Sequence, residues 1–238
     1  AEISYRNAIE IKPNYAEAHS NLGNILKDLG NLQDAEISYR NAIKIKPNYA
    51  QAHYNLGNIL KDLGKLKDAE LSYRKAIEIK PGFAYAHYNL GNILKDLGKL
   101  KEAELSYRKA IEIKPDFAEA YLYLGHILRV NGKIEEVLPL AKSALKLKTI
   151  NKGERLQISL QIAINNLILG NFDETLVNIN RTINLINQGG LDLIKNKNQK
   201  NQMRIYSQFI SSLYRQLKKD YHPSSMEKIP FVGESHCL

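Results

Sequence analysis

The sequence has a single cysteine, Cys237, among its 238 residues. One cysteine cannot form a disulfide within the chain, and a structural zinc site needs several cysteine or histidine ligands at close spacing. The sequence also lacks any apolar run that approaches the roughly 20 residues of a membrane-spanning helix. We therefore expect a soluble, cytoplasmic protein whose fold needs no crosslink, metal or cofactor and which has no membrane partner.

Charge of one sign is not in large excess either, because 34 lysines and arginines are offset by 25 aspartates and glutamates, for a net charge of +9. A positive balance raises nucleic acid as a partner. Most basic residues, however, are interleaved with acidic ones, as in Lys27-Asp28 and Lys61-Asp62. We therefore keep RNA binding, through these lysines, Lys95 and the nearby tyrosines, as a minor alternative.

What the sequence does contain is a repeat of 34 residues. Residues 35–68 and 69–102 are identical at 27 of 34 positions. Three sets of residues keep the same spacing along the chain: Gly23, Gly57, Gly91 and Gly125; Gly30, Gly64, Gly98 and Gly132; Pro13, Pro47, Pro81 and Pro115. A fixed period of this length predicts a stack of similar supersecondary units, each of which contacts mainly its neighbours.

Each repeat predicts two amphipathic helices. In residues 50–63 apolar or small side chains recur three or four positions apart, which is typical of a helix with one buried face. A second helix is predicted between Gly64 and Pro81. Small residues such as Gly57 let the two antiparallel helices approach closely, and Tyr73 fills the space between successive hairpins. Each hairpin leaves an apolar face that only a neighbouring hairpin covers.

This pattern resembles the tetratricopeptide repeat family, which has a large residue, Leu-Gly, an apolar residue, Ala, an aromatic residue, Ala and Pro at fixed offsets. In residues 50–83 the corresponding residues are His53, Leu56, Gly57, Leu60, Ala69, Tyr73, Ala76 and Pro81. The resemblance implies an all-α, right-handed solenoid of antiparallel helical hairpins. It also implies a protein-interaction scaffold without catalytic activity.

The decay of the pattern divides the chain into segments. Residues 1–14 are predicted to be the second helix of a truncated repeat, residues 16–117 three regular repeats, residues 118–151 a degenerate repeat and residues 152–186 a diverged capping hairpin. We expect a linker at 187–200, a helix at 201–221, and at 228–238 the first strand and turn of a further domain that is truncated here.

The first helix of each regular repeat carries an evenly spaced polar face. Leu56 and Leu60 point to the packed interior, which leaves the polar residues on the other side of the helix. The predicted peptide-binding residues are Asn21, Asn24, Asn55, Asn58, Asn89, Asn92, Tyr54, Tyr88, Lys61 and Lys95. An asparagine amide has two donors and two acceptor sites, so it can pair with the backbone of an extended peptide of any sequence. The alternative interpretation is that duplication preserves these asparagines and that they only solvate the groove.

The segments Ser-Asn-Leu-Gly-Asn and Tyr-Asn-Leu-Gly-Asn resemble the superhelix of protein O-linked N-acetylglucosamine transferases, in which an asparagine ladder holds peptide backbone. The resemblance implies this role for Asn21, Asn55 and Asn89, with the asparagine three positions later in each helix as a secondary candidate. Tyr123 interrupts the series in the next repeat. The sugar-nucleotide domain has no counterpart here, so the resemblance implies a binding surface and not the activity.

The C-terminal residues differ in kind. After a predicted strand at 229–232, Gly233-Glu234-Ser235 resembles the first block of SGNH-type, GDSL-like hydrolases and acyltransferases, where a Gly-Asp-Ser turn presents a nucleophilic serine. Glu234 departs from the usual aspartate, and no base or oxyanion donor for Ser235 can be assigned within this sequence. We therefore predict that the chain itself is not an enzyme and that Ser235 is a candidate nucleophile only in a longer chain.

Together these patterns predict a scaffold that binds a protein or an extended peptide in a concave groove and presents it to a C-terminal catalytic domain. The alternative is a fragment of an SGNH-like hydrolase or acyltransferase, or of a glycosyltransferase linked to such repeats. His19, His53 and His87 lie a full repeat apart at packing positions, so we interpret them as structural residues and not as metal ligands.

Overall fold

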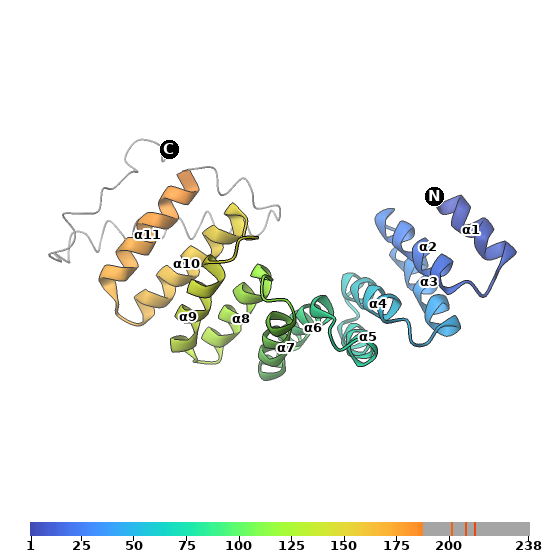
Figure 1. Cartoon of the computed structure of the whole chain (residues 1–238), viewed down its shortest axis with the longest axis horizontal. Helices are drawn as coiled ribbons and strands as arrows, with labels where there is room; N and C mark the ends of the chain where they lie inside the picture. The colour runs from blue at the N-terminus through green and yellow to red at the C-terminus, as the bar shows by residue number, and fades with distance from the viewer. Residues whose placement is uncertain (188–200, 202–207, 209–211, 213–238) are drawn as a thin grey trace. The chain divides into compact units, whose positions relative to one another are not determined.

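The computed structural model describes residues 1–187 together with Asn201, Gln208 and Ser212 (Figure 1). Within these residues the chain forms helices and no strand, so the predicted all-α class is confirmed. The helices are α1 (Glu2–Ile11), α2 (Ala16–Asp28), α3 (Leu32–Ile45), α4 (Ala50–Asp62), α5 (Leu66–Ile79), α6 (Ala84–Asp96), α7 (Leu100–Ile113), α8 (Ala118–Val130), α9 (Ile134–Leu145), α10 (Lys152–Ile168) and α11 (Phe172–Asn187). They form an N-terminal unit, Ala1–Pro115, and a C-terminal unit that begins at Asp116.

The N-terminal unit is a stack of antiparallel helical hairpins. The pairs α2–α3, α4–α5 and α6–α7 each pack along their length, and Figure 1 shows them in succession from blue to green. The second helix of one hairpin packs against the first helix of the next, as in α3 against α4 and α5 against α6. The predicted hairpin stack is therefore confirmed for these repeats.

Glycine and proline set the ends of the helices. Gly64 has a φ of +74°, and the N–H of Lys65 donates to the carbonyl oxygen of Leu60 at 2.8 Å, which closes the end of α4 in a left-handed turn. Only glycine adopts this φ without strain. At the other end of the hairpin, α5 stops at Ile79, because proline disfavours helical geometry in the residue before it and Lys80 is extended ahead of Pro81.

A close contact between glycine and tyrosine holds the two helices of each regular hairpin together. A Cβ atom on Gly57 would lie 2.7 Å from Cε1 of Tyr73, a distance that real Cβ contacts do not reach. Gly23 and Gly91 meet Tyr39 and Tyr107 in the same way. All three tyrosines are fully buried. The glycine is therefore needed because the ring occupies the volume where any other side chain would start.

The C-terminal unit keeps the glycine but replaces the tyrosine. Gly125 of α8 is met by the side chain of Gln161 from α10, which lies 2.7 Å from a Cβ built on that glycine. Gln161 Nε2 donates to the carbonyl oxygen of Leu122 at 3.1 Å. The structure begins α10 at a capping box formed by Asn151 and Glu154. The core of the C-terminal unit includes buried side chains from the segment between the start of α8 and α10: Ala118, Ala141, Ala144, Ile150, Ile158 and Ile162.

Ion pairs connect successive second helices of the N-terminal unit. Glu70 on α5 accepts from Arg74 one turn later and from Lys99 of the next repeat, with the Lys99 Nζ at 2.8 Å. Burial opposes ionisation of Glu70, but these two cations outweigh it and hold the pKa of the carboxyl below its ordinary value. Glu36 makes the equivalent contacts with Arg40 and Lys65.

Three sequence predictions fall outside the described residues. These are the linker at 187–200, except Asn187, which ends α11; the helix at 201–221, except for Asn201, Gln208 and Ser212; and the strand and turn at 228–238, which include Ser235.

We predict that Gly57→Ala destabilises the N-terminal unit by about 1–3 kcal/mol, because the new methyl group overfills the contact with Tyr73. Gly82→Ala is the matched control: a Cβ atom there has open space, and the backbone is not left-handed. The control should change the stability by less than about 1 kcal/mol. The urea midpoint, followed by far-ultraviolet circular dichroism, distinguishes the two. Equal midpoints for both variants would show that the tyrosine contact does not limit packing.

We also predict that protonation of Glu70 causes part of the protein's loss of stability at acidic pH. Because the folded pKa of this carboxyl lies below its ordinary value of 4.5, its stabilisation is complete above that pH and is lost as the pH falls through the folded pKa. The urea midpoint should therefore fall less between pH 7 and pH 3 in Glu70→Gln than in the wild type. Glu10→Gln, at an exposed position without an ion pair among the described residues, should follow the wild type. Parallel pH profiles for all three proteins would contradict the prediction.

Candidate functional site

The structure places the predicted asparagines on the first helices α2, α4 and α6. In each helix the two asparagines are three positions apart, as Asn55 and Asn58 are, so they share one face. We call the six residues the asparagine ladder: Asn21, Asn24, Asn55, Asn58, Asn89 and Asn92. All lie within the N-terminal unit.

A buried tyrosine holds the second asparagine of each pair. Tyr39 donates its hydroxyl hydrogen to Oδ1 of Asn24 at 2.7 Å, and Tyr73 donates to Oδ1 of Asn58 at 2.8 Å. Tyr107 repeats the bond with Asn92 at 2.8 Å. Burial raises the pKa of Tyr39 and of Tyr73, so these hydroxyls stay protonated and act as donors. Each bond therefore fixes which side of the amide faces the packed tyrosine.

A second set of bonds joins one repeat to the next. Nδ2 of Asn55 donates to Oδ1 of Asn24 at 3.1 Å, and Nδ2 of Asn89 donates to Oδ1 of Asn58 at 3.0 Å. Asn89 Nδ2 also donates to the hydroxyl of Tyr54 at 3.2 Å. These bonds connect the asparagines of α2 with those of α4, and the asparagines of α4 with those of α6.

These bonds determine what the ladder offers to a ligand. The oxygens of Asn24 and Asn58 each accept two hydrogen bonds, from a tyrosine and from the next asparagine, so both of their acceptor sites are occupied. The amide hydrogens of Asn24, whose side chain is exposed, have no bond among the described residues. At Asn24 the ladder therefore presents N–H donors, which pair with carbonyl oxygens.

The sequence did not reveal the role of the tyrosine hydroxyls. From the sequence alone, Tyr73 is expected only to pack and Asn58 only to be a secondary peptide contact. The signal that connects them is a constant separation of 15 residues between the asparagine and the tyrosine, as in Asn24 with Tyr39. Residues 15 apart meet only when the two helices of a hairpin close on each other.

The two predicted tyrosines on the ladder face are partly used in packing. The ring of Tyr54 lies 4.8 Å from that of Phe83 and 5.9 Å from that of Tyr73, between ring centroids. Burial raises the pKa of Tyr54. Tyr88 is 6.0 Å from Tyr107 of the same hairpin. Both side chains are partly exposed.

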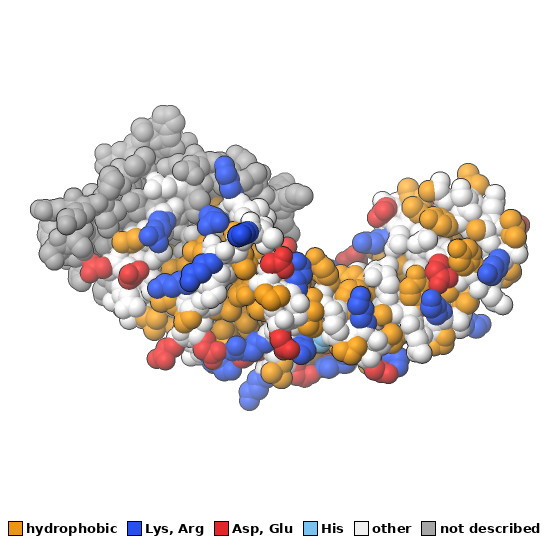
Figure 2. Space-filling model, viewed as in Figure 1, with side chains coloured by type: hydrophobic (Ala, Val, Ile, Leu, Met, Phe, Trp, Pro, Cys, Tyr) orange, Lys and Arg blue, Asp and Glu red, His pale blue; other side chains and the backbone are white. Residues whose placement is uncertain are grey.

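The predicted lysines Lys61 and Lys95 each have an acidic neighbour. Lys61 Nζ lies 3.6 Å from Asp62, and Lys95 Nζ lies 3.0 Å from Asp96. On the visible face of the N-terminal unit, Figure 2 shows basic and acidic side chains interspersed among apolar ones. This face therefore has no continuous stripe of positive charge along which a nucleic-acid backbone could bind.

The structure gives the three histidines a packing role. Nε2 of His19, His53 and His87 lies 2.9 Å, 2.9 Å and 3.0 Å from the carbonyl oxygen of the proline six residues earlier. A carbonyl only accepts, so this nitrogen carries the hydrogen. Burial lowers the pKa of His87. Among residues 1–187 and the three later ones that the structure describes, no group of three His, Cys, Asp or Glu side chains is placed to hold a metal ion.

None of the described helices is long and apolar enough to cross a lipid bilayer.

Three family models match the chain. A model described as TPR repeat matches residues 4–30, 23–64 and 57–98, and two models described as tetratricopeptide repeat match residues 84–117 and 106–138. Together the matches run without a gap from residue 4 to residue 138, which is more than half of the chain. The comparison with curated proteins finds no match.

Solved structures share the fold. YrrB, described as a TPR protein with an unusual peptide-binding site, has a TM-score of 0.68 at 22% identity over 78% of this chain and 93% of its own. MamA has a TM-score of 0.59 at 28% identity over 62% of this chain and 86% of its own. MamA from Desulfovibrio magneticus RS-1 has a TM-score of 0.65 at 17% identity over 73% and 96%. From the family models and the hairpin geometry, the chain belongs to the tetratricopeptide repeat family.

Proposed function

We propose that the N-terminal unit binds an extended peptide, or an extended segment of a partner protein, along the asparagine ladder. The repeats make the chain a protein-interaction scaffold. The main support for binding along the ladder is its chain of hydrogen bonds, in which a tyrosine donates to one asparagine and the asparagine of the next repeat donates to the same oxygen. These bonds orient the amides of adjacent repeats in the same way. An array that only solvates a groove has no need for a fixed orientation.

The chemistry of the ladder suits peptide backbone. An extended peptide presents carbonyl oxygens at regular intervals whatever its sequence. The amide hydrogens of Asn24 can donate to these carbonyl oxygens. The side-chain oxygen of Asn89 accepts no bond among the described residues, so it can accept a hydrogen bond from a backbone N–H of the peptide. The partly exposed rings of Tyr54 and Tyr88 add apolar contact beside the polar groups of the ladder. Recognition is then mainly independent of the ligand's side chains.

The comparisons support this function at the level of fold. YrrB, which is similar in fold, is described as having a peptide-binding site. The likeness of the Asn-Leu-Gly-Asn segments to the superhelix of glycosyltransferases favours the same face. Presentation of the bound segment to a catalytic domain is a further proposal that rests on this likeness. The alternative, in which a longer chain is a hydrolase or acyltransferase with Ser235 as the nucleophile, rests only on the likeness of Gly233-Glu234-Ser235 to the first block of those enzymes.

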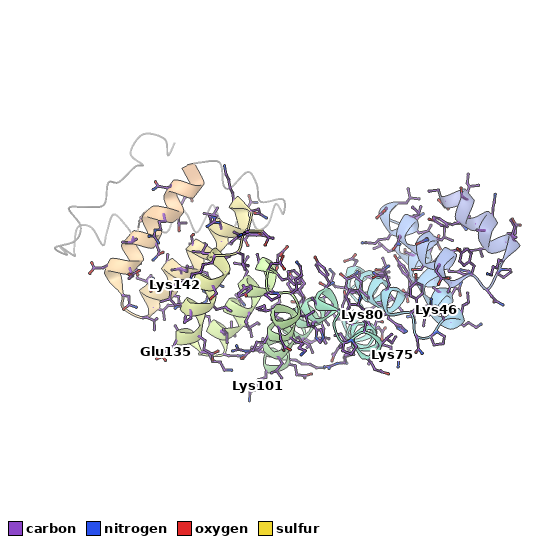
Figure 3. All side chains as sticks on the ribbon, viewed as in Figure 1. Lys46, Lys75, Lys80, Lys101, Glu135 and Lys142 are labelled. Carbon is purple, nitrogen blue, oxygen red and sulfur yellow. The ribbon has the colours of Figure 1, made fainter. Side chains whose placement is uncertain are left out.

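We expect the triple variant Asn21→Ala, Asn55→Ala, Asn89→Ala to bind a panel of unstructured peptides of unrelated sequence at least about tenfold more weakly, because three polar contacts are lost. The matched control replaces Gln33, Lys67 and Lys101 by alanine. These exposed residues have the same spacing but lie on the second helices, and Figure 3 shows Lys101 on α7. Fluorescence anisotropy gives the affinities, and circular dichroism checks that helicity is unchanged.

Two results would overturn the proposal. One is affinity that survives the triple substitution, which would favour solvation as the role of the asparagines. The other is binding that collapses steeply with modest salt and extends to single-stranded RNA, which would favour the nucleic-acid alternative.

We further expect Tyr73→Phe to weaken peptide binding by about threefold, since the ring still fills its site but Asn58 loses the donor that fixes its amide. The control is Tyr5→Phe. Tyr5 occupies the same position of the repeat on α1 but makes no hydrogen bond through its side chain among the described residues. An equal effect of both substitutions, or none from either, would show that the hydroxyl does not orient the ladder.

A further inference from the structure

A cleft lies between α3 and α5, on the side of α4 away from the asparagine ladder. His53, which reaches into the cleft, is two residues before Asn55 and therefore about 200° around the helix from it. The cleft has a volume of about 400 Å³ and is lined by Arg40, Ile43, Lys44, His53, Leu56, Leu71, Ser72 and Lys75. Leu71 is 67% exposed at its edge. This volume accommodates one or two large apolar side chains.

The repeat produces the same cleft twice more. The cleft between α1 and α3, of about 540 Å³, has Ile9 and Ile37 where the central one has Ile43 and Leu71. The cleft between α5 and α7, of about 430 Å³, has Ile77 and Leu105 at these positions. The three clefts thus share their apolar walls, so their differences lie in the charged residues at the rim.

Charge distinguishes the central cleft from the other two. Its lining contains three cations, Arg40, Lys44 and Lys75, and no carboxylate. At the position of Lys44 the flanking clefts have an acidic residue, which is Glu10 in one and Glu78 in the other. This is the one change of sign relative to the α5–α7 cleft, whereas the α1–α3 cleft also has Asp34 in its lining and Asn41 at the position of Lys75.

The positive charge of Lys44 is not neutralised within the described part of the protein. Arg40 pairs with Glu36 at 2.8 Å, and Lys75 pairs with Glu78 at 2.6 Å. Lys75 extends from α5 at the lower edge of the N-terminal unit in Figure 3. Lys44 is exposed and has no side-chain hydrogen bond or ion pair among the residues that the structure describes. An acidic group on a partner would therefore meet Lys44 without displacing an internal carboxylate.

The walls of the cleft favour a helix as the bound element. Both sides are helices, whose backbone N–H and C=O groups are bonded within α3 and α5, so they offer no edge to an extended strand. A helix satisfies its own backbone and needs only an apolar stripe for the walls and acidic residues for the rim.

We propose that the α3–α5 cleft binds an amphipathic helix of a partner protein, with a large apolar side chain between Ile43 and Leu71 and an acidic residue opposite Lys44. Opposite charge across such a rim selects the partner and speeds its association. This surface is separate from the asparagine ladder and does not rest on the function proposed for it. A scaffold with both surfaces holds two segments at once.

The test uses the full chain and a fluorescent helical peptide with leucines on one face and glutamates beside them. A peptide with lysines in place of the glutamates is the control ligand. We expect anisotropy to show saturable binding of the acidic peptide only. Lys44→Glu should weaken it at least about fivefold, because repulsion replaces attraction at the rim. Leu71→Ser, at an exposed position, should weaken it without loss of helicity.

The neighbouring cleft supplies a gain-of-function control. Adding Glu78→Lys to Lys44→Glu places a third cation beside Arg74 and Lys109 at the rim of the α5–α7 cleft, which then matches the wild-type rim of the central cleft. The double variant should recover the affinity, whereas Lys44→Glu with Glu78→Gln, which also removes the ion-pair partner of Lys75 but adds no cation, should not. Lys101→Ala, at an exposed position that lines none of the three clefts and is not part of the ladder, should bind the acidic peptide as the wild type does. Equal binding of acidic and basic peptides, no effect of Lys44→Glu, or no recovery in the double variant would overturn the proposal.

Discussion

The contact of a glycine with a tyrosine ring is the constraint on which the N-terminal unit depends. Without a side chain on Gly57, Tyr73 of the second helix packs directly against the backbone of the first. The ring excludes water from the hairpin, and its hydroxyl emerges on the far side at Asn58. Asn58 in turn accepts from Asn89 of the next hairpin. One missing side chain thus fixes the hairpin geometry, the orientation of an amide and the connection between repeats.

The helices of the regular repeats could be predicted from the sequence because local rules determine them. Glycine after the first helix and proline after the second specify their ends, and the observed α4 stops one residue before the predicted boundary at 63. The C-terminal unit was harder to predict in detail, because Ala141 stands where the tyrosine should be. Gln161, from the next helix along the chain, takes over the contact with Gly125. The repeat pattern describes one hairpin at a time, so it does not reveal that a side chain from another helix replaces the missing tyrosine.

The candidate site could be predicted only in part for the same reason. The asparagines were identifiable from their spacing, but the partners of Asn24 are 15 and 31 residues away. The α3–α5 cleft combines residues from three helices. Only an alignment of whole repeats shows that Lys44 stands where the other two clefts have Glu10 and Glu78. In the sequence it is one lysine among many. Its meaning depends on the apolar walls that tertiary packing places beside it.

The bonds from Asn55 and Asn89 to the preceding repeat also make the ladder modular in length. Asn55 and Asn89 occupy equivalent positions and donate to equivalent neighbours, so a 34-residue copy inserted between them would find the same partners on both sides. Each inserted copy would lengthen the donor array by one rung without redesign of the others. Duplication or loss of a whole repeat would therefore change the length of polypeptide that the scaffold holds while keeping its mode of recognition.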